Sequence, residues 1–226
     1  MWTTTDIRKV INTHPPKNDN PCAFVSPANS YGAMDGGIDD IYSIMFPGPP
    51  TIEEVVKDCI RENTIFYNKP LFISRVKSIK PEPVIPVGSG LIVPIPKGEK
   101  VMYSDNTFLI SVPTMVIPNN VSKSRNAYFS TLAMLKVVEK FNRSKKTRKR
   151  VKTIYIPGMC TGCGLMPLEQ AVEQMMRAIK DWEERGHPYD NIDELLTPDN
   201  VVIFQSLHHR DDIDMSGHKF TLPFQT

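Results

Sequence analysis

The sequence predicts an α/β fold, a three-layer α/β/α sandwich with a mixed central sheet, in a single domain that spans residues 1–226. Two observations indicate this class. Short apolar runs typical of buried strands alternate with longer segments in which apolar residues recur at helical spacing. In addition, the strand candidates at residues 22–25 and 153–156 are each followed by a glycine-rich loop and then by a helical pattern.

Four segments carry helical signals. The first begins after the first glycine-rich loop, and the second opens at Thr51 and Glu54, which form a capping box. Ser124 is expected to cap the third helix, and Pro167 suits the first position of the fourth. The apolar residues that mark these helices are Ile38, Ile41, Ile44 and Met45; Val55, Val56, Cys59 and Ile60; Tyr128, Leu132, Leu135 and Val138; and Leu168, Val172, Met175, Ile179 and Trp182.

The other strand candidates are short apolar runs separated by proline- and glycine-rich turns. They are residues 71–73, 90–93, 107–110 and 201–204. Strands interleaved with helices in this way favour a mixed sheet with helices packed on it.

The composition is that of a globular protein. Hydrophobic residues make up 40% and charged residues 23% of the chain, which is long enough to bury a core. No apolar stretch is long enough to span a membrane, and residues 1–12 are mixed and polar, unlike a signal peptide. The sequence therefore predicts a soluble, intracellular protein, cytoplasmic or nuclear, with no membrane partner.

Four cysteines in a chain of this length do not make a disulfide scaffold. Cys160 and Cys163 form a C-x-x-C pattern, but a zinc site needs a second ligand pair, and Cys22 and Cys59 lie far apart in apolar surroundings. The histidine pair at residues 208–209 is interpreted as an exposed polar turn. We therefore expect no metal, and small residues that fill a tight loop at Cys160 and Cys163.

A run of basic residues extends from Lys140 to Lys152. It is compatible with a nuclear signal or a nucleic-acid patch, or with a solvated helix end and the loop that follows it. The formal net charge is only +2, and no aromatic residue is interleaved after Phe141 as a single-strand binder would need. The solvated surface is the favoured interpretation, and nucleic-acid binding is a weak alternative.

The two glycine-rich loops are the candidate functional feature. The first runs from Asn29 through Gly36 and Gly37, and the second covers residues 157–164. Glycine lets backbone N–H groups approach a ligand closely, and a helix N-terminus favours an anion such as phosphate. Ligands of open α/β sheets bind at the carboxyl ends of the strands. The two loops are therefore expected to hold a diphosphate from both sides, with Asn29 suited to a sugar diol.

These motifs resemble those of the macrodomain family, a group of ADP-ribose-binding modules. Residues 26–29 resemble the family's Asn-Ala-Ala-Asn stretch, residues 35–37 its glycine cluster, and residues 157–164 its Pro-Gly-x-x-Thr-Gly-x-Gly loop. Residues 112–115 and 126–128 are similar to its middle strand and the helix start that follows. The resemblance covers approximately residues 20–205. It implies a macrodomain-like fold, no cofactor, and ADP-ribose or an ADP-ribosylated protein as the partner.

The resemblance also implies roles for particular residues. Asn29 matches the Asn that orients the distal ribose. Asp39 matches the Asp of the branch that removes ADP-ribose from proteins, where the carboxylate positions or deprotonates a water. The structural alternative for Asp39 is that it complements the helix dipole. The residues implied to bind the ligand are Ala28, Asn29, Gly36, Gly37, Ile38, Gly158, Cys160, Thr161, Gly162, Cys163, Gly164 and, as the platform for adenine, Phe204.

Three departures from the family pattern leave the function open. Asp35 stands where many members have a third glycine, and Gly164 stands where many have an aromatic residue that covers the distal ribose. Neither Asp6 nor Asp19 lies in a motif that matches the acidic residue which contacts adenine. We predict a hydrolase of mono-ADP-ribosyl-protein linkages. The alternatives are an ADP-ribose 1″-phosphate phosphatase and a non-catalytic ADP-ribose reader.

Overall fold

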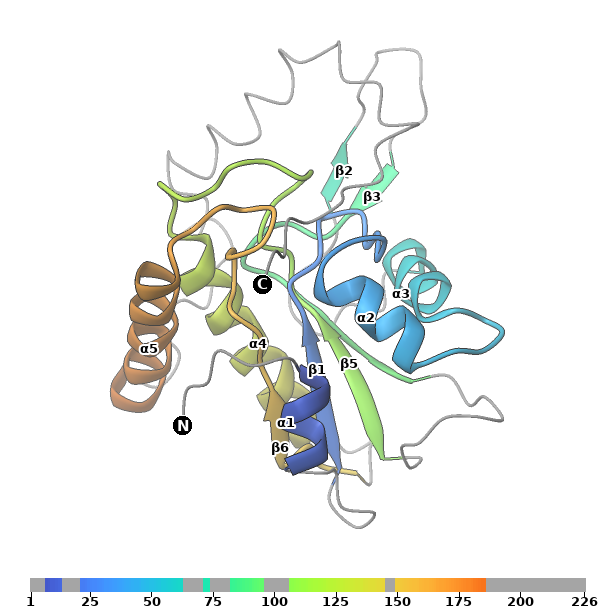
Figure 1. Cartoon of the computed structure of the whole chain (residues 1–226). Coiled ribbons are helices and arrows are strands. Elements are labelled where there is room, and N and C mark those ends of the chain that lie inside the picture. The colour runs from blue at the N-terminus through green and yellow to red at the C-terminus, as the bar shows by residue number, and fades with distance from the viewer. Residues whose placement is uncertain are drawn as a thin grey trace.

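The computed structural model describes residues 7–13, 21–62, 71–73, 82–95, 106–144 and 149–185. Within these ranges the chain forms helices and a mixed open sheet, so the predicted α/β class is confirmed (Figure 1). The helices are α1 (Ile7–Thr13), α2 (Ile38–Met45), α3 (Ile52–Arg61), α4 (Asn126–Arg143) and α5 (Leu168–Arg185). The strands are β1 (Cys22–Ser26), β2 (Leu71–Ile73), β3 (Glu82–Val84), β4 (Leu91–Pro94), β5 (Thr107–Ser111) and β6 (Thr153–Tyr155).

The main sheet has the strand order β4-β5-β1-β6. Strand β1 pairs in parallel with both β5 and β6, whereas β4 runs antiparallel to β5, so the sheet is mixed as predicted. Strands β2 and β3 form a separate antiparallel pair. Because parallel strands end at the same side of a sheet, the segments after β1, β5 and β6 all leave from one edge, called here the carboxyl edge.

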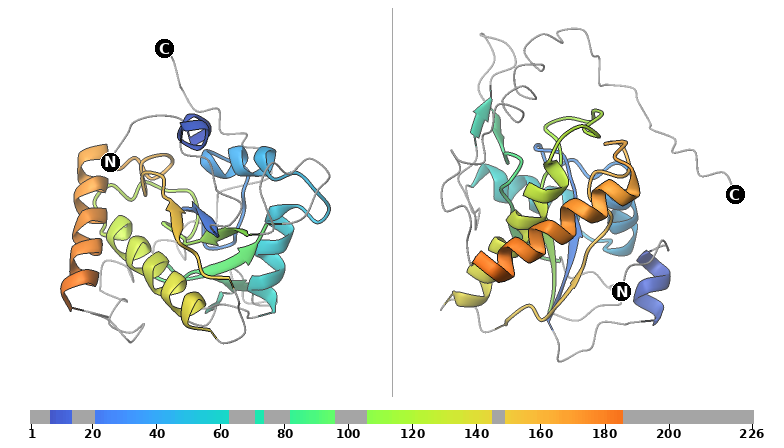
Figure 2. Two further views of the ribbon diagram at one scale, coloured as in Figure 1. Left: turned by 90° about the horizontal axis from the view of Figure 1, so that it is seen from below. Right: turned by 90° about the vertical axis from the view of Figure 1, so that its left-hand side faces the viewer.

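Helices pack on both faces of the main sheet (Figure 2). Side chains alternate along β1, so that neighbouring residues enter different apolar clusters. Phe24 lies in a cluster with Tyr42 of α2 and Val56 of α3. Val25 lies in a second cluster with Met134 of α4 and Met175 of α5. The core is therefore split between the two faces of the sheet, and the carboxyl edge remains between the two groups of helices.

Helix α3 begins at the predicted capping box. Thr51 Oγ1 accepts the Glu54 N–H at 3.2 Å, and Glu54 Oε2 accepts the Thr51 N–H at 2.8 Å. The hydrogen bonds from Thr51 hold the pKa of the Glu54 carboxyl below its usual value. The buried residues of α3 are Ile52, Val56 and Ile60, while Val55 and Cys59, which the sequence also placed on the inner face, are half-buried.

The starts of α4 and α5 lie close to their predicted positions. The N-cap residue of α4 is Arg125 and not the predicted Ser124, although Ser124 Oγ accepts the Asn126 N–H at 3.2 Å. Helix α5 begins one residue later than predicted, and the Pro167 carbonyl accepts the Ala171 N–H at 2.9 Å. Leu168 is 42% exposed, because the buried stripe of α5 starts at Ala171.

Two elements were missed by the sequence analysis. Helix α1 lies in the segment interpreted as mixed and polar, and it buries Ile11 in the same cluster as Phe24. Strand β3 contains Pro83, a residue that occurs in strands chiefly at edges.

Ile44 continues the helical spacing of α2 but is 71% exposed. The last strand candidate, residues 201–204, lies outside the described residues, and none of the described helices is long and apolar enough to cross a membrane.

Candidate functional site

Three loops meet at the carboxyl edge of the sheet. They follow β1, β5 and β6, and backbone hydrogen bonds join the loop after β5 to the other two (Figure 1). These bonds run from Val112 N–H to Ser26 O (3.0 Å), from Thr114 N–H to Ala28 O (3.1 Å), from Ser30 N–H to Met115 O (3.0 Å) and from Val121 N–H to Gly164 O (3.0 Å). The structure thus brings together both glycine-rich loops and the segment after β5, although they are far apart in the sequence.

Thr114 is the residue that links the three loops most directly. Its hydroxyl donates to the Pro27 carbonyl at 3.1 Å, and its own carbonyl accepts from Asn126 Nδ2 at 2.8 Å. The Thr114 side chain also faces the thiol of Cys160 in the second loop. Burial raises the pKa of the Cys160 thiol to about 12, which outweighs the opposite effect of Thr114. Cys160 is therefore a buried neutral thiol, and only its backbone is suited to contact a ligand.

Asn29 shapes the first loop. Its Oδ1 accepts the N–H of Tyr31 at 2.9 Å and the N–H of Ala33 at 3.3 Å, so the side-chain oxygen holds the turn after β1. The side chain is half-buried, and within the described part of the chain its Nδ2 makes no hydrogen bond. Asn29 can therefore offer a donor to a ligand while its oxygen remains fixed.

The glycine cluster of the first loop has an open face. Gly37 precedes α2 with φ at 62°, in the left-handed region that favours glycine, and the helix start has no side-chain cap. A Cβ placed on Gly36 or Gly37 would meet no atom within 4 Å. The N–H groups of Gly36, Gly37 and Ile38 are in no hydrogen bond between described residues. This segment therefore presents backbone donors at a helix N-terminus.

Asp39, in the first turn of α2, is the most unusual residue of the site. The residue is 7% exposed, and its Oδ1 has no hydrogen-bond partner among the described residues. Burial raises the pKa of its carboxyl to about 7, and the negative charges of Asp35 and Glu53 add to this rise. The Ser26 hydroxyl faces the carboxyl and lowers its pKa, but no well-formed hydrogen bond joins them, because Ser26 Oγ also lacks a partner.

In the second loop, Gly162 has free space around its Cα, whereas Gly164 is closely packed. A Cβ on Gly162 would meet no atom within 4 Å, whereas a Cβ on Gly164 would lie 2.5 Å from the Cys160 carbonyl oxygen. Gly162 and Cys160 accept the N–H groups of Leu165 (2.9 Å) and Met166 (3.0 Å), which close the loop, and Cys160 has φ at 64°. None of residues 158–164 donates its N–H to another described residue. Gly164 therefore serves the packing of the loop, and Gly162 lies on its open face.

Some of the other predicted ligand-binding residues stabilise the loops, and others lie on the surface or outside the described residues. The Thr161 hydroxyl donates to the Gly158 carbonyl at 2.9 Å, so that side chain stabilises the turn. Cys163 is exposed. In the first loop Ala28 is buried, and its carbonyl is bound to the Thr114 N–H. Phe204, the expected platform for adenine, lies outside the described residues, as does the histidine pair.

The four cysteines are all free, and the described ranges contain no cluster of three or more His, Cys, Asp or Glu side chains placed to hold a metal ion. Because Cys163 is exposed, Cys163→Ser is expected to change the free energy of unfolding by no more than about 0.5 kcal/mol, as measured by urea denaturation. Elemental analysis of the purified protein is expected to find no stoichiometric zinc. One zinc per chain, lost in Cys163→Ser, would contradict this.

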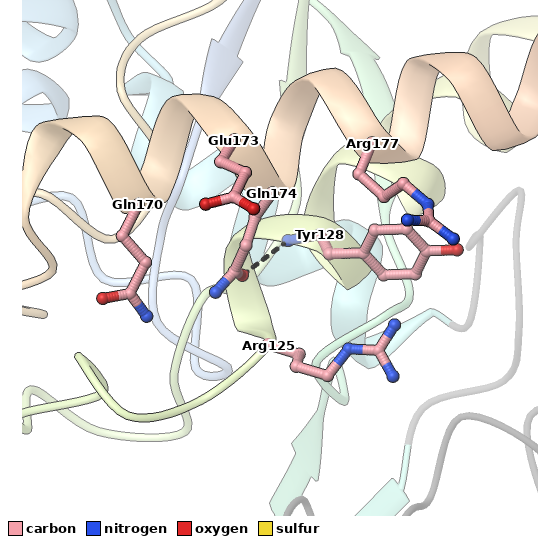
Figure 3. A pocket seen from close by; sticks show the side chains of 6 residues that line it. All are labelled: Arg125, Tyr128, Gln170, Glu173, Gln174 and Arg177. Carbon is pink, nitrogen blue, oxygen red and sulfur yellow. Dashed lines mark hydrogen bonds between the residues drawn. The ribbon is translucent and has the colours of Figure 1, made fainter.

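A shallow pocket of about 210 Å³ lies elsewhere, between α4 and α5 (Figure 3). Its amide side chains are already used: Gln174 accepts the Tyr128 N–H at 3.2 Å and donates to the Ser124 carbonyl, and Gln170 donates to the Ser122 carbonyl. It contains no residue that the sequence assigned to the site. Its lining residues are Arg125, Tyr128, Gln170, Glu173, Gln174 and Arg177. We interpret it as part of the contact surface through which α5 packs against the start of α4.

The basic run lies away from the glycine-rich loops. Lys140 and Arg143 occupy the last turn of α4, where positive charge complements the helix dipole, and Arg143 pairs with Glu139 at 2.6 Å. Arg150 and Lys152 are exposed just before β6, and residues 145–148 lie outside the described part of the chain. These positions agree with a solvated helix end followed by a loop.

No model of a known protein family matches the chain, and a search among curated proteins finds no similar sequence. The function is therefore argued from the geometry of the carboxyl edge.

Proposed function

We propose that this chain is a macrodomain-like protein, a three-layer α/β/α sandwich that binds ADP-ribose at the carboxyl edge and hydrolyses an ADP-ribose linkage there. One observation carries the proposal. Among the described residues, the buried Asp39 Oδ1 has no hydrogen-bond partner, and Asp39 directly follows a loop whose backbone N–H groups make no hydrogen bond. A second such loop leaves the same edge of the sheet.

The binding step rests on the backbone. The pyrophosphate lies across the two loops and accepts hydrogen bonds from N–H groups around Gly37 and Gly162, where no side chain obstructs close approach. Asn29 Nδ2 donates to a hydroxyl of the distal ribose, while its oxygen remains bound to the loop. These donors address phosphate and ribose, so adenine alone is expected to bind far more weakly than ADP-ribose.

The chemical step rests on Asp39. Because its pKa is raised to about 7, the carboxyl is part ionised near neutral pH and is suited to act as a general base. A water attacks C1″ of the distal ribose, the water's proton passes to Asp39, and the bond from C1″ to the acceptor's carboxylate oxygen breaks. ADP-ribose and a free carboxylate side chain are the products.

The deep burial of Asp39 favours a second candidate, a non-catalytic reader of ADP-ribose in which this carboxyl only supports the start of α2. An assay of release separates the candidates. The wild-type protein is incubated with a protein mono-ADP-ribosylated on acidic side chains and, separately, with ADP-ribose 1″-phosphate. Release of ADP-ribose from the protein supports the proposed hydrolase, and release of phosphate alone supports the phosphatase. Binding without either product would establish the reader.

Replacement of Gly162 by valine is expected to abolish ADP-ribose binding while the fold remains intact. The new side chain would project from the open face of the loop, over the N–H groups offered to the phosphates, and it would meet no protein atom at its Cβ. The φ of Gly162 is not in the left-handed region, so a β-branched residue is compatible with the backbone. Calorimetric titration measures the loss, and an unchanged melting temperature is the control. Wild-type affinity in Gly162→Val would remove this loop from the site.

A further inference from the structure

Two buried serine hydroxyls lie at the carboxyl edge, one of them facing Asp39, and neither has a hydrogen-bond partner within the described ranges. Ser26 ends β1 and Ser111 ends β5, and the two residues are paired in register across these neighbouring strands. Both are completely buried, and the Oγ atom of each is unpaired. Unpaired buried polar atoms are rare in native proteins because each lacks the hydrogen bonds that it would make in water.

The strand alternation places both hydroxyls on the face of the sheet that carries α2. Ser26 follows Phe24 by two residues and Ser111 follows Leu109 by two, and both apolar residues belong to the cluster that includes Tyr42 of α2. Ser26 faces the carboxyl of Asp39 on that helix. Three unpaired polar atoms, Ser111 Oγ, Ser26 Oγ and Asp39 Oδ1, therefore lie in series from β5 through β1 to α2.

The surroundings of Asp39 supply negative charge but, in the described ranges, no positive partner. Asp35 of the first loop and Glu53 of α3 both act on the carboxyl with like charge, and Tyr42 lies beside it on α2. The Tyr42 hydroxyl already donates to the Val25 carbonyl at 3.2 Å. Among the described residues, the Ser26 hydroxyl is the side-chain donor that faces an ionised Asp39 and has no other partner, and Ser111 lies next to Ser26 in register on β5.

We propose that Ser26 and Ser111 form a hydrogen-bonded relay, in which the Ser111 hydroxyl donates to Ser26 Oγ and the Ser26 hydroxyl donates to the ionised Asp39 carboxylate. In this relay each of the three atoms has a hydrogen-bond partner. The two serines are positioning residues: they stabilise the ionised form of Asp39 and hold its orientation. Only the catalytic consequence rests on the proposed function, since the relay acts on the ionisation of Asp39 with or without a ligand.

The direct test is the titration of the Asp39 side-chain carboxyl by carbon-13 NMR in the unliganded protein. A hydrogen bond donated to a carboxylate lowers the pKa of that carboxyl by about 1 to 2. Ser26→Ala, which removes this bond, is therefore expected to raise the Asp39 pKa by about that amount. Ser111→Ala is expected to raise it less. In the double variant the Ser111 effect is expected to disappear, because Ser111 acts through Ser26.

The matched control is Ser130→Ala. Ser130 is equally buried, but its hydroxyl donates to the Pro113 carbonyl at 2.7 Å, so its loss is expected to leave the Asp39 pKa unchanged. An unchanged Asp39 pKa in Ser26→Ala would overturn the relay, as would a Ser111 effect of the same size in both backgrounds. If Ser26→Ala does not fold, Ser111→Ala alone is the test. An Asp39 pKa that does not rise in Ser111→Ala would then overturn the relay.

If the proposed hydrolase activity is present, the same variants give a second readout. At pH 7 the activity of Ser26→Ala is expected to fall about 5- to 50-fold, because a smaller fraction of Asp39 is ionised, and to recover at pH 9. A merely structural loss would not recover at high pH, and that result would contradict the relay. The NMR titration remains decisive when no hydrolysis is found, so the relay and the proposed function can fail separately.

Discussion

Asp39→Ala is expected to lower the hydrolysis of a mono-ADP-ribosylated protein by about 100- to 10,000-fold, the contribution typical of one well-placed general base. ADP-ribose affinity is expected to change much less, because the carboxylate acts on the attacking water and not on the bound phosphates. Loss of turnover with binding retained is the signature of an interaction made chiefly in the transition state. Single-turnover release of ADP-ribose, together with calorimetric titration, measures both quantities.

The chain offers a matched control for this variant in the next residue. Asp40 lies in the same first turn of α2 and has the same charge, but its side chain is exposed. Asp40→Ala therefore removes a similar contribution to the helix dipole and is expected to leave turnover unchanged. A decrease of less than about tenfold in Asp39→Ala would mean that Asp39 serves the helix start, where a carboxylate is worth about 0.3–1 kcal/mol.

Asn29→Ala is expected to lower turnover and also to weaken ADP-ribose binding. Its Oδ1 holds the N–H groups of Tyr31 and Ala33, so the variant loses both the ribose donor and the shape of the first loop. The two variants therefore differ in the quantity that they affect most: kcat for Asp39 and affinity for Asn29.

The second large effect is on stability. In the unfolded chain the Asp39 carboxyl has a pKa near 3.8, and in the folded protein burial raises this value to about 7. Below about pH 4 the carboxyl is protonated in the folded and in the unfolded state, so its ionisation does not affect the free energy of unfolding. Between pH 4 and pH 7 only the unfolded state releases the proton, so the free energy of unfolding falls as the pH rises. Above pH 7 the full penalty, about 4 kcal/mol, is present.

Asp39→Asn retains the shape of the protonated side chain and cannot ionise. It is expected to be more stable than the wild-type protein by up to about 4 kcal/mol at pH 8 and nearly equal to it at pH 4. Urea denaturation at the two pH values measures the difference, with Asp40→Asn as the exposed control. Equal gains at both pH values would show that Asp39 has an ordinary pKa in the folded protein.

The sequence predicted those parts of the fold that depend on local patterns. The capping box at Thr51 and the apolar runs of β1 and β5 are signals contained in a few neighbouring residues, and the structure has these elements where the pattern indicated them. Helix α1 was missed because its 7 residues are too few for the helical spacing of Ile7, Val10 and Ile11 to be distinctive, and it is fixed by the burial of Ile11 in the core. The exposure of Ile44 likewise depends on which neighbour covers α2, which periodicity alone does not reveal.

The sequence predicted the two glycine-rich loops of the candidate site but not the contacts that join them. The open backbone at Gly162 and the helix start after Gly37 follow from the glycine pattern. By contrast, the joining of the three loops through Thr114 and the pairing of Ser26 with Ser111 depend on strand order, which brings together residues that are distant in the sequence. Serines at strand ends are too common to be singled out without that order.

Calorimetric titration of the full chain with ADP-ribose tests the central claim most directly. We expect saturable heat that fits one site per chain, far weaker binding of free adenine, and no heat with Gly162→Val. No heat and no thermal shift with ADP-ribose at millimolar concentration would contradict the assignment of the two glycine-rich loops as an ADP-ribose site.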